Sequence, residues 1–139
     1  MHRRSFFKTT GLAALAAASR AEAAAPLSPR AELVELAGAT AQGAFAAQEF
    51  LRFAGPRLAS RDATLADCAA SGGEMVAACD ALMALAASDA PFAYGFARTA
   101  ADLCAATRRD CEKLPKIAEC VTLAAAAASC EAACRKAAG

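Results

Sequence analysis

Seven cysteines on alanine-rich sequence constrain the fold of this chain more than any other feature. They all lie beyond residue 67, at Cys68, Cys79, Cys104, Cys111, Cys120, Cys130 and Cys134. At about 100° per residue, Cys68 and Cys79 differ by only about 20° around a helix axis, and Cys130 and Cys134 are neighbours on a helix surface. The spacing therefore predicts three helices that each carry thiols on one side.

Composition and apolar periodicity favour an all-α fold. The 139 residues are 58% hydrophobic, and much of that share is alanine, the best helix former. Strict alternation is absent and β-branched residues are scarce, which argues against strands. The pattern predicts helices over about 31–54, 64–87, 91–113 and 115–137. Because their connections are short, we expect an antiparallel four-helix bundle over residues 24–139, a single domain.

Turn and capping residues set the expected helix ends. Glycine and proline stop a helix, proline is tolerated in a first turn, and short polar side chains cap the N-terminus. The signals are Gly55-Pro56 at the end of the first helix, Asp62 or Thr64 ahead of the second, Pro91 at the third and Pro115 at the fourth.

The N-terminus has the pattern of an export signal. A basic start with adjacent Arg3 and Arg4 precedes an apolar run over residues 11–18 and a small-x-small cleavage pattern at residues 21–23. The paired arginines favour a twin-arginine-type signal peptide over residues 1–23, and an ordinary secretory signal is the alternative. We expect a soluble periplasmic protein that uses the twin-arginine export machinery, without stable membrane insertion after the leader is removed.

Charge gives no case for nucleic acid as a partner. The formal net charge of the whole chain is +1, from 15 basic and 14 acidic residues. The leader accounts for four of the basic residues and one acidic residue, so 11 basic and 13 acidic residues remain, a net charge of −2. A nearly neutral domain lacks the basic surface that nucleic-acid binding requires.

Metal binding explains seven cysteines better than disulfides or idle core thiols do. Seven is an odd number, and cysteines seven apart on one helix are separated by about 10.5 Å of rise, beyond the reach of a bridge. Bridges between helices, for instance from Cys79 to Cys104, remain an alternative for an exported protein. Idle thiols are a liability in an oxidising compartment.

Ligand type favours Cu(I). The only histidine, His2, lies in the leader, which excludes zinc sites built on histidine from the mature chain. No C-x2-C spacing occurs, which weakens zinc ribbons and iron–sulfur clusters. Soft thiolates select Cu(I). Met75 and Met83, each four residues from Cys79, are second-rank candidate ligands, and core filling is the alternative role for both.

The sequence resembles the bacterial copper storage proteins. The resemblance covers roughly residue 39 to the C-terminus and rests on the cysteines and their neighbours in residues 62–68 (DATLADC), 75–86 (MVAACDALMALA), 109–112 with Cys104, and 130–136 (CEAACRK). It implies a four-helix bundle that holds Cu(I) along its core, with a twin-arginine leader in exported members.

The chain departs from that family pattern in its number of cysteines. Family members carry thiols on the first helix, where this chain has Ala46 and Phe50, and also at the positions of Arg108, Leu123 and Ala127. Glu49 stands near a position that is often histidine, and the connection between the third and fourth helices is shorter. The resemblance therefore implies a reduced metal capacity, with Arg108 interrupting the cysteine rows.

The preferred function is an exported Cu(I)-binding protein that stores or sequesters copper through thiolates in the bundle core. The alternative is a structural or interaction bundle that has lost most metal storage and is held in part by disulfides. An enzyme is not expected, because a mature chain without histidine lacks the usual general base. Association into a homo-oligomer stays open.

Overall fold

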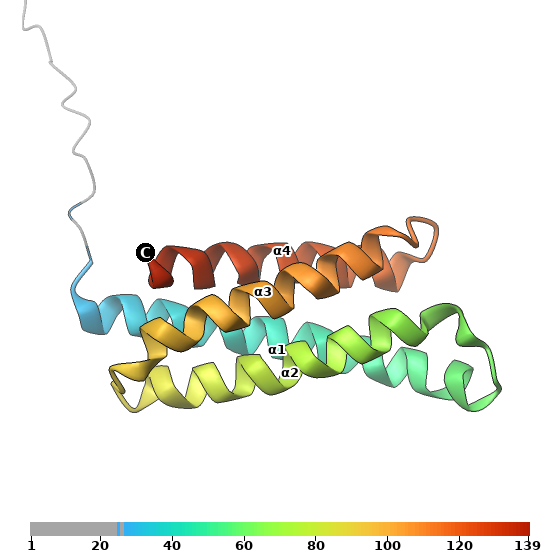
Figure 1. Cartoon of the computed structure of the whole chain (residues 1–139), viewed down its shortest axis with the longest axis horizontal. Coiled ribbons are helices and arrows are strands. Elements are labelled where there is room, and N and C mark those ends of the chain that lie inside the picture. The colour runs from blue at the N-terminus through green and yellow to red at the C-terminus, as the bar shows by residue number, and fades with distance from the viewer. Residues whose placement is uncertain (1–24, 26) are drawn as a thin grey trace, which may run out of the picture.

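The computed structural model describes residues 25 and 27–139 (Figure 1). Four α-helices fill this part of the chain: α1 (Pro29–Ala59), α2 (Ala66–Ala87), α3 (Phe92–Glu112) and α4 (Ala118–Ala138). A 3₁₀ turn, η1 (Ala63–Leu65), precedes α2. Successive helices run in opposite directions, and both α1 and α3 pack against α2 and α4. The expected all-α four-helix bundle is confirmed, with no strand in the described residues.

The expected leader lies outside the described residues. Its twin-arginine pair, its cleavage pattern and the boundary at residue 24 therefore stay predictions from the sequence. The described bundle begins at α1, whose N-terminus is capped by the Ser28 hydroxyl, which accepts a hydrogen bond from the Ala31 amide at 3.3 Å.

Alanine lets the helices approach one another closely. Four alanines on α3 form a stripe at helical spacing and are completely buried: Ala93, Ala97, Ala100 and Ala101. Such small side chains leave room for the backbones of α2 and α4 on either side. The core between the helices is therefore narrow enough for short side chains, cysteine among them, to meet across it.

Two helix boundaries differ from the sequence prediction. α1 continues through Gly55 and Pro56 to Ala59, because both residues face solvent and Leu58, two residues after Pro56, still packs against the core. Proline there removes one hydrogen bond at the exposed end of a long helix and does not stop it. α4 begins at Ala118 and not at Pro115, which lies in the turn after α3.

The most apolar helical stretch belongs to the core of the bundle. Residues Ala63–Ala87, which cover η1 and α2, are long and apolar enough by length and composition to cross a membrane, with a mean hydropathy of 1.3. In the structure this stretch packs between α1 and α3 and buries Cys68, Met75 and Cys79 completely. Its exposed side is largely alanine, so core burial and helix propensity together account for the apolar sequence.

α1 and α2 end in the same type of turn, with a non-glycine residue in the left-handed region. Arg61 has a φ of 66° and Asp89 a φ of 53°. At the end of α1 the Asp62 amide donates to the Arg57 carbonyl at 3.1 Å, the long hydrogen bond of a Schellman turn. Aspartate tolerates this conformation, whereas arginine is strained in it, so Arg61 is a position where glycine would fit better.

Arg61→Gly should stabilise the protein by about 1 kcal/mol, because glycine removes the steric cost of a positive φ. Urea unfolding followed by circular dichroism measures the change. Ala59→Gly, two residues earlier inside the helix, is the matched control and should destabilise by about 0.5–1 kcal/mol. An Arg61→Gly variant as unstable as Ala59→Gly would show that residue 61 does not adopt this turn.

Candidate metal centre

All seven cysteines lie in the core of the bundle. Each is at most 1% exposed, and each is a free thiol in the structure. α2, α3 and α4 supply them, and α1 supplies none. The expectation that three helices point thiols toward a shared interior is confirmed.

Three of these thiols are close enough together to hold one metal ion. The sulfur atoms of Cys79, Cys104 and Cys130 lie within 4.8 Å of one another, and those of Cys79 and Cys130 are 3.6 Å apart. Cys134 lies one helical turn beyond Cys130 and interacts with Cys104 and Cys130. With metal–sulfur bonds of about 2.3 Å, two sulfurs on one ion are up to about 4.6 Å apart, so the three thiols are already close to the spacing that a shared ion would require. We call Cys79, Cys104, Cys130 and Cys134 the four-thiol cluster.

The remaining cysteines form a second set nearer the other end of the bundle. Cys111, near the end of α3, interacts with Cys68 at the start of α2 and with Cys120 at the start of α4. Their three sulfurs are more widely spaced than those of Cys79, Cys104 and Cys130. In the described residues, no other set of three cysteine or acidic ligand atoms lies within 4.8 Å of one another. We call these residues the three-thiol group.

A layer of apolar side chains separates the two sets of thiols. On α2, Gly72 lies between Cys68 and Cys79, and a Cβ placed on it would lie 3.8 Å from Leu123 Cδ2 and 4.0 Å from Phe50 Cδ1. Leu123 and Phe50 are both buried, from α4 and α1 respectively. The sequence indicated thiols along one axis, and the structure divides that axis into two compartments.

The first helix closes the four-thiol cluster with a glycine that the sequence reasoning did not single out. A Cβ placed on Gly43 would lie 2.9 Å from Cys130 Sγ, 3.1 Å from Cys130 Cβ and 3.2 Å from Met75 Cε. Distances below 3.0 Å are clashes, so this close approach of α1 to α4 requires glycine. The sequence did contain a signal for this close approach. Glycine in the middle of a helix lowers helix stability by about 1 kcal/mol relative to alanine, so its presence there indicates a packing requirement.

The two candidate methionine ligands differ in their placement. Met75 is fully buried, and its methyl group reaches the same point beside Gly43 as the Cys130 sulfur. Met83 is only half-buried on α2. Met75 therefore borders the four-thiol cluster, and the structure gives Met83 no comparable position.

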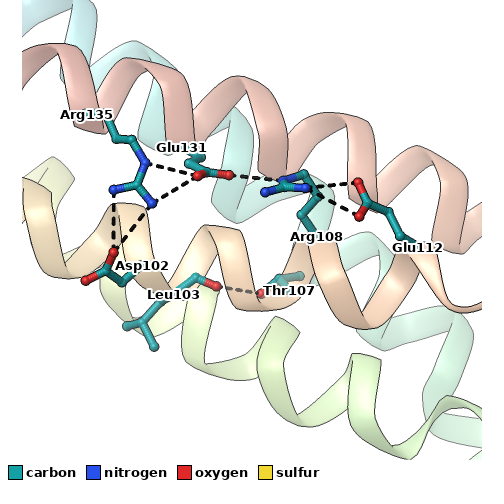
Figure 2. Close-up of polar contacts among 7 residues, drawn as sticks. All are labelled: Asp102, Leu103, Thr107, Arg108, Glu112, Glu131 and Arg135. Atoms are coloured by element: carbon teal, nitrogen blue, oxygen red, sulfur yellow. Dashed lines mark hydrogen bonds and ion pairs between the residues drawn. The ribbon is translucent and has the colours of Figure 1, made fainter.

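Arg108, expected to interrupt the cysteine rows, lies on the outside of the bundle (Figure 2). Its guanidinium pairs with Glu131 at 3.1 Å and with Glu112 at 3.1 Å, and Arg135 joins Glu131 to Asp102. Burial alone would raise the pKa of Glu131, but the two arginines lower it. The charges thus bridge α3 and α4 at the surface and leave the core neutral.

Sulfur is the main kind of atom in the core that could bind a metal ion. The buried polar side chains of the described residues are Thr40, Ser71 and Thr107, and each hydroxyl donates to a backbone carbonyl at 2.9–3.0 Å. No carboxylate is buried with the thiols in this part of the chain. Thiolates without hard oxygen ligands suit soft metal ions.

The thiols of the four-thiol cluster share their protons. Contacts with Cys130, Cys134 and Cys79, together with burial, raise the pKa of Cys104 far above that of an ordinary thiol. The pKa of Cys130 is lowered, because the Cys104, Cys134 and Cys79 thiols surround its sulfur. One thiolate is therefore stabilised by its neighbours, and further ionisation is opposed by charge and burial. A metal ion has to displace the remaining protons.

Comparison with known proteins gives no relative on which to base a function. No protein-family model matches the chain, and a search of curated proteins finds no match. The copper storage resemblance therefore stays a prediction from the sequence.

Gly43→Ala should lower the free energy of unfolding even though alanine favours a helix. The gain in helix propensity is about 1 kcal/mol, and overpacking against Cys130 costs about 1–3 kcal/mol. Gly38→Ala is the matched control, since a Cβ at Gly38 has no neighbour within 4 Å. Urea unfolding of both variants should show Gly38→Ala more stable than wild type and Gly43→Ala less stable. Equal stabilisation of both would contradict the close approach.

The metal-free protein should lose stability at alkaline pH. Burial, then the Cys68 charge, raises the pKa of Cys120 to about 11. The Cys104 contact lowers the pKa of Cys134, but contact with Cys130 and burial outweigh it and raise that pKa to about 12. Above the ordinary thiol pKa of about 8.5, the unfolded chain binds fewer protons than the folded one.

Each such thiol should therefore lower the free energy of unfolding by up to about 1.4 kcal/mol per pH unit between about pH 9 and 11. Urea unfolding at pH 7.5, 9 and 10.5 under reducing conditions measures this slope. The double variant Cys120→Ala and Cys134→Ala should show a shallower slope. An identical slope in both proteins would count against buried, protonated thiols.

Proposed function

We propose that the protein binds Cu(I) through its buried thiols and stores or sequesters the metal. The observation that carries this proposal is the four-thiol cluster, in which three sulfurs from three helices lie within 4.8 Å of one another. Ordinary core packing has no need of three sulfurs at metal-bridging distance, whereas thiolate ligation requires it.

The arrangement of the thiols favours Cu(I) over zinc. A structural zinc site needs four ligands in tetrahedral geometry, whereas the set of sulfurs within 4.8 Å of one another in the described residues has three members, Cys79, Cys104 and Cys130. Cu(I) is satisfied by soft sulfur ligands alone, and Met75 borders the cluster with a thioether. A chain that places seven thiols in two unequal sets is therefore better suited to Cu(I).

We further propose that the protein acts after export, as the leader and the resemblance to copper storage proteins suggest. Storage requires no turnover, and the mature chain has no histidine to serve as a general base. Enclosure of the thiols by α1 supports sequestration, because a buried ion is protected from exchange with solvent. The apolar layer at Phe50 and Leu123 supports a capacity smaller than that of a bundle lined with sulfur throughout.

A structural bundle without metal storage is the competing function. The apolar side chains of Phe50 and Leu123 favour it, since they fill space that the copper storage family uses for thiols. It predicts that the protein folds fully without metal and that its cysteines contribute only packing.

Anaerobic titration of the reduced protein with Cu(I), against a competing chelator, tests the proposal. We expect at least one tightly bound ion per chain, with release of about two to four protons at pH 7 as the ion displaces them from the thiols. Acid should weaken binding for the same reason. Parallel titration with Zn(II) should show weaker binding, and excess Cu(I) should displace the zinc.

Two matched triple variants locate the site. Changing Cys79, Cys104 and Cys130 to serine should abolish the tightest binding, while changing Cys68, Cys111 and Cys120 to serine should retain it. Circular dichroism shows whether each variant folds. Equal loss in both variants, or binding of less than about one ion by wild type, would leave the structural bundle as the better account.

A further inference from the structure

A surface pocket of about 140 Å³ leads directly to the four-thiol cluster. It lies between α1 and α4 and is lined by Ala39, Gln42, Gly43, Ala126, Ser129 and Cys130. Four other surface pockets in the described residues have no cysteine in their linings. Of these five pockets, this one alone brings solvent to a cysteine.

Small residues make the wall of this pocket thin. Gly43 has no side chain, and Ala39 and Ala126 present only a methyl group each. The Cys130 sulfur lies directly behind Gly43, 2.9 Å from where a Cβ would be. Cys130 itself is only 1% exposed, although it forms part of the pocket lining.

The size of the pocket limits what can occupy it. A water molecule takes about 30 Å³, so 140 Å³ accommodates about four waters, or a metal ion with a ligand of a few heavy atoms. A loop of a folded carrier protein would not fit. The exposed Gln42 and Ser129 give the rim a polar character suited to a small hydrated complex.

We propose that metal reaches the four-thiol cluster through this pocket, with Cys130 as the first ligand to bind it. This inference rests on the proposed function. The incoming species is a Cu(I) complex of a small thiol. The bond from copper to the Cys130 thiolate forms as the bond to the carrier thiolate breaks, the carrier thiolate takes up a proton from solvent, and copper remains Cu(I). Cys79 and Cys104 then replace any remaining carrier ligand.

Thiol labelling tests this route without metal. The reduced, metal-free protein is treated with less than one equivalent of methyl methanethiosulfonate, and the modified cysteine is identified by mass spectrometry of the peptides. Cys130 should be modified at least about ten-fold faster than Cys79 or Cys104, because deeper thiols require larger local opening. Equal rates at these three residues, or earlier labelling of the three-thiol group, would overturn the proposal.

Plugging the pocket tests the route from both of its walls. Ser129→Trp on α4 and Gln42→Trp on α1 should each slow labelling of Cys130 by at least about ten-fold. The matched controls are Ala132→Trp and Ala41→Trp, which are exposed on the same helices and do not line the pocket. Unchanged labelling of Cys130 in both plugged variants would overturn the proposal.

Copper loading separates this proposal from the proposed function. With Cu(I) supplied as its N-acetylcysteine complex, the plugged variants should load more slowly than the controls and reach the same final stoichiometry. Equal loading rates in plugged and control proteins would overturn the route and leave copper binding intact. Fast labelling of Cys130 in a protein that binds no Cu(I) would contradict the proposed function and the metal route with it, and would show only that the pocket gives access to Cys130.

Discussion

Close approach of the four helices is the constraint on which the thiol cluster depends. Cysteine is a short side chain, so sulfurs from three helices meet only where the backbones are near one another. Buried alanines such as Ala97 and Ala101 permit this on α3, and Gly43 permits it where α1 covers Cys130. A larger residue at these positions would separate the helices and with them the three sulfurs that lie within 4.8 Å.

The sequence predicted the helices and the faces that carry cysteine, because helical periodicity fixes the angle between residues on one helix. It did not predict how the cysteines group, since that depends on the relative axial positions of different helices. The layer formed by Phe50, Gly72 and Leu123 divides the thiols into two sets, and no single-helix pattern contains it. For the same reason Gly43 was missed, although a Cβ placed on it would lie 2.9 Å from Cys130 Sγ. Two predicted helix boundaries were wrong. Pro56 is exposed near the end of α1 and does not stop that helix, and Pro115 lies in the turn three residues before α4 begins.

The same burial that stabilises the bundle makes the thiols dependent on metal for ionisation. The core of the described residues holds no buried carboxylate or basic side chain, and the arginines and carboxylates of α3 and α4 pair with one another outside the thiols. A Cu(I) ion would offset only part of the negative charge that the displaced protons leave on the thiolates, so contacts with the neighbouring thiols would have to stabilise the remainder. The pocket beside Gly43 offers a way for the exchange to take place without unfolding the bundle. The contact between Gly43 and Cys130 therefore matters both for the packing of α1 against α4 and for access to the thiols.

The most direct test of this account is X-ray absorption at the copper K-edge of the reduced protein loaded with one equivalent of Cu(I). The account predicts a coordination shell of sulfur alone, because the core of the described residues offers no buried carboxylate or imidazole. Oxygen or nitrogen ligands in the first coordination shell would show that copper binds at the surface, and would contradict a metal centre built from the four-thiol cluster.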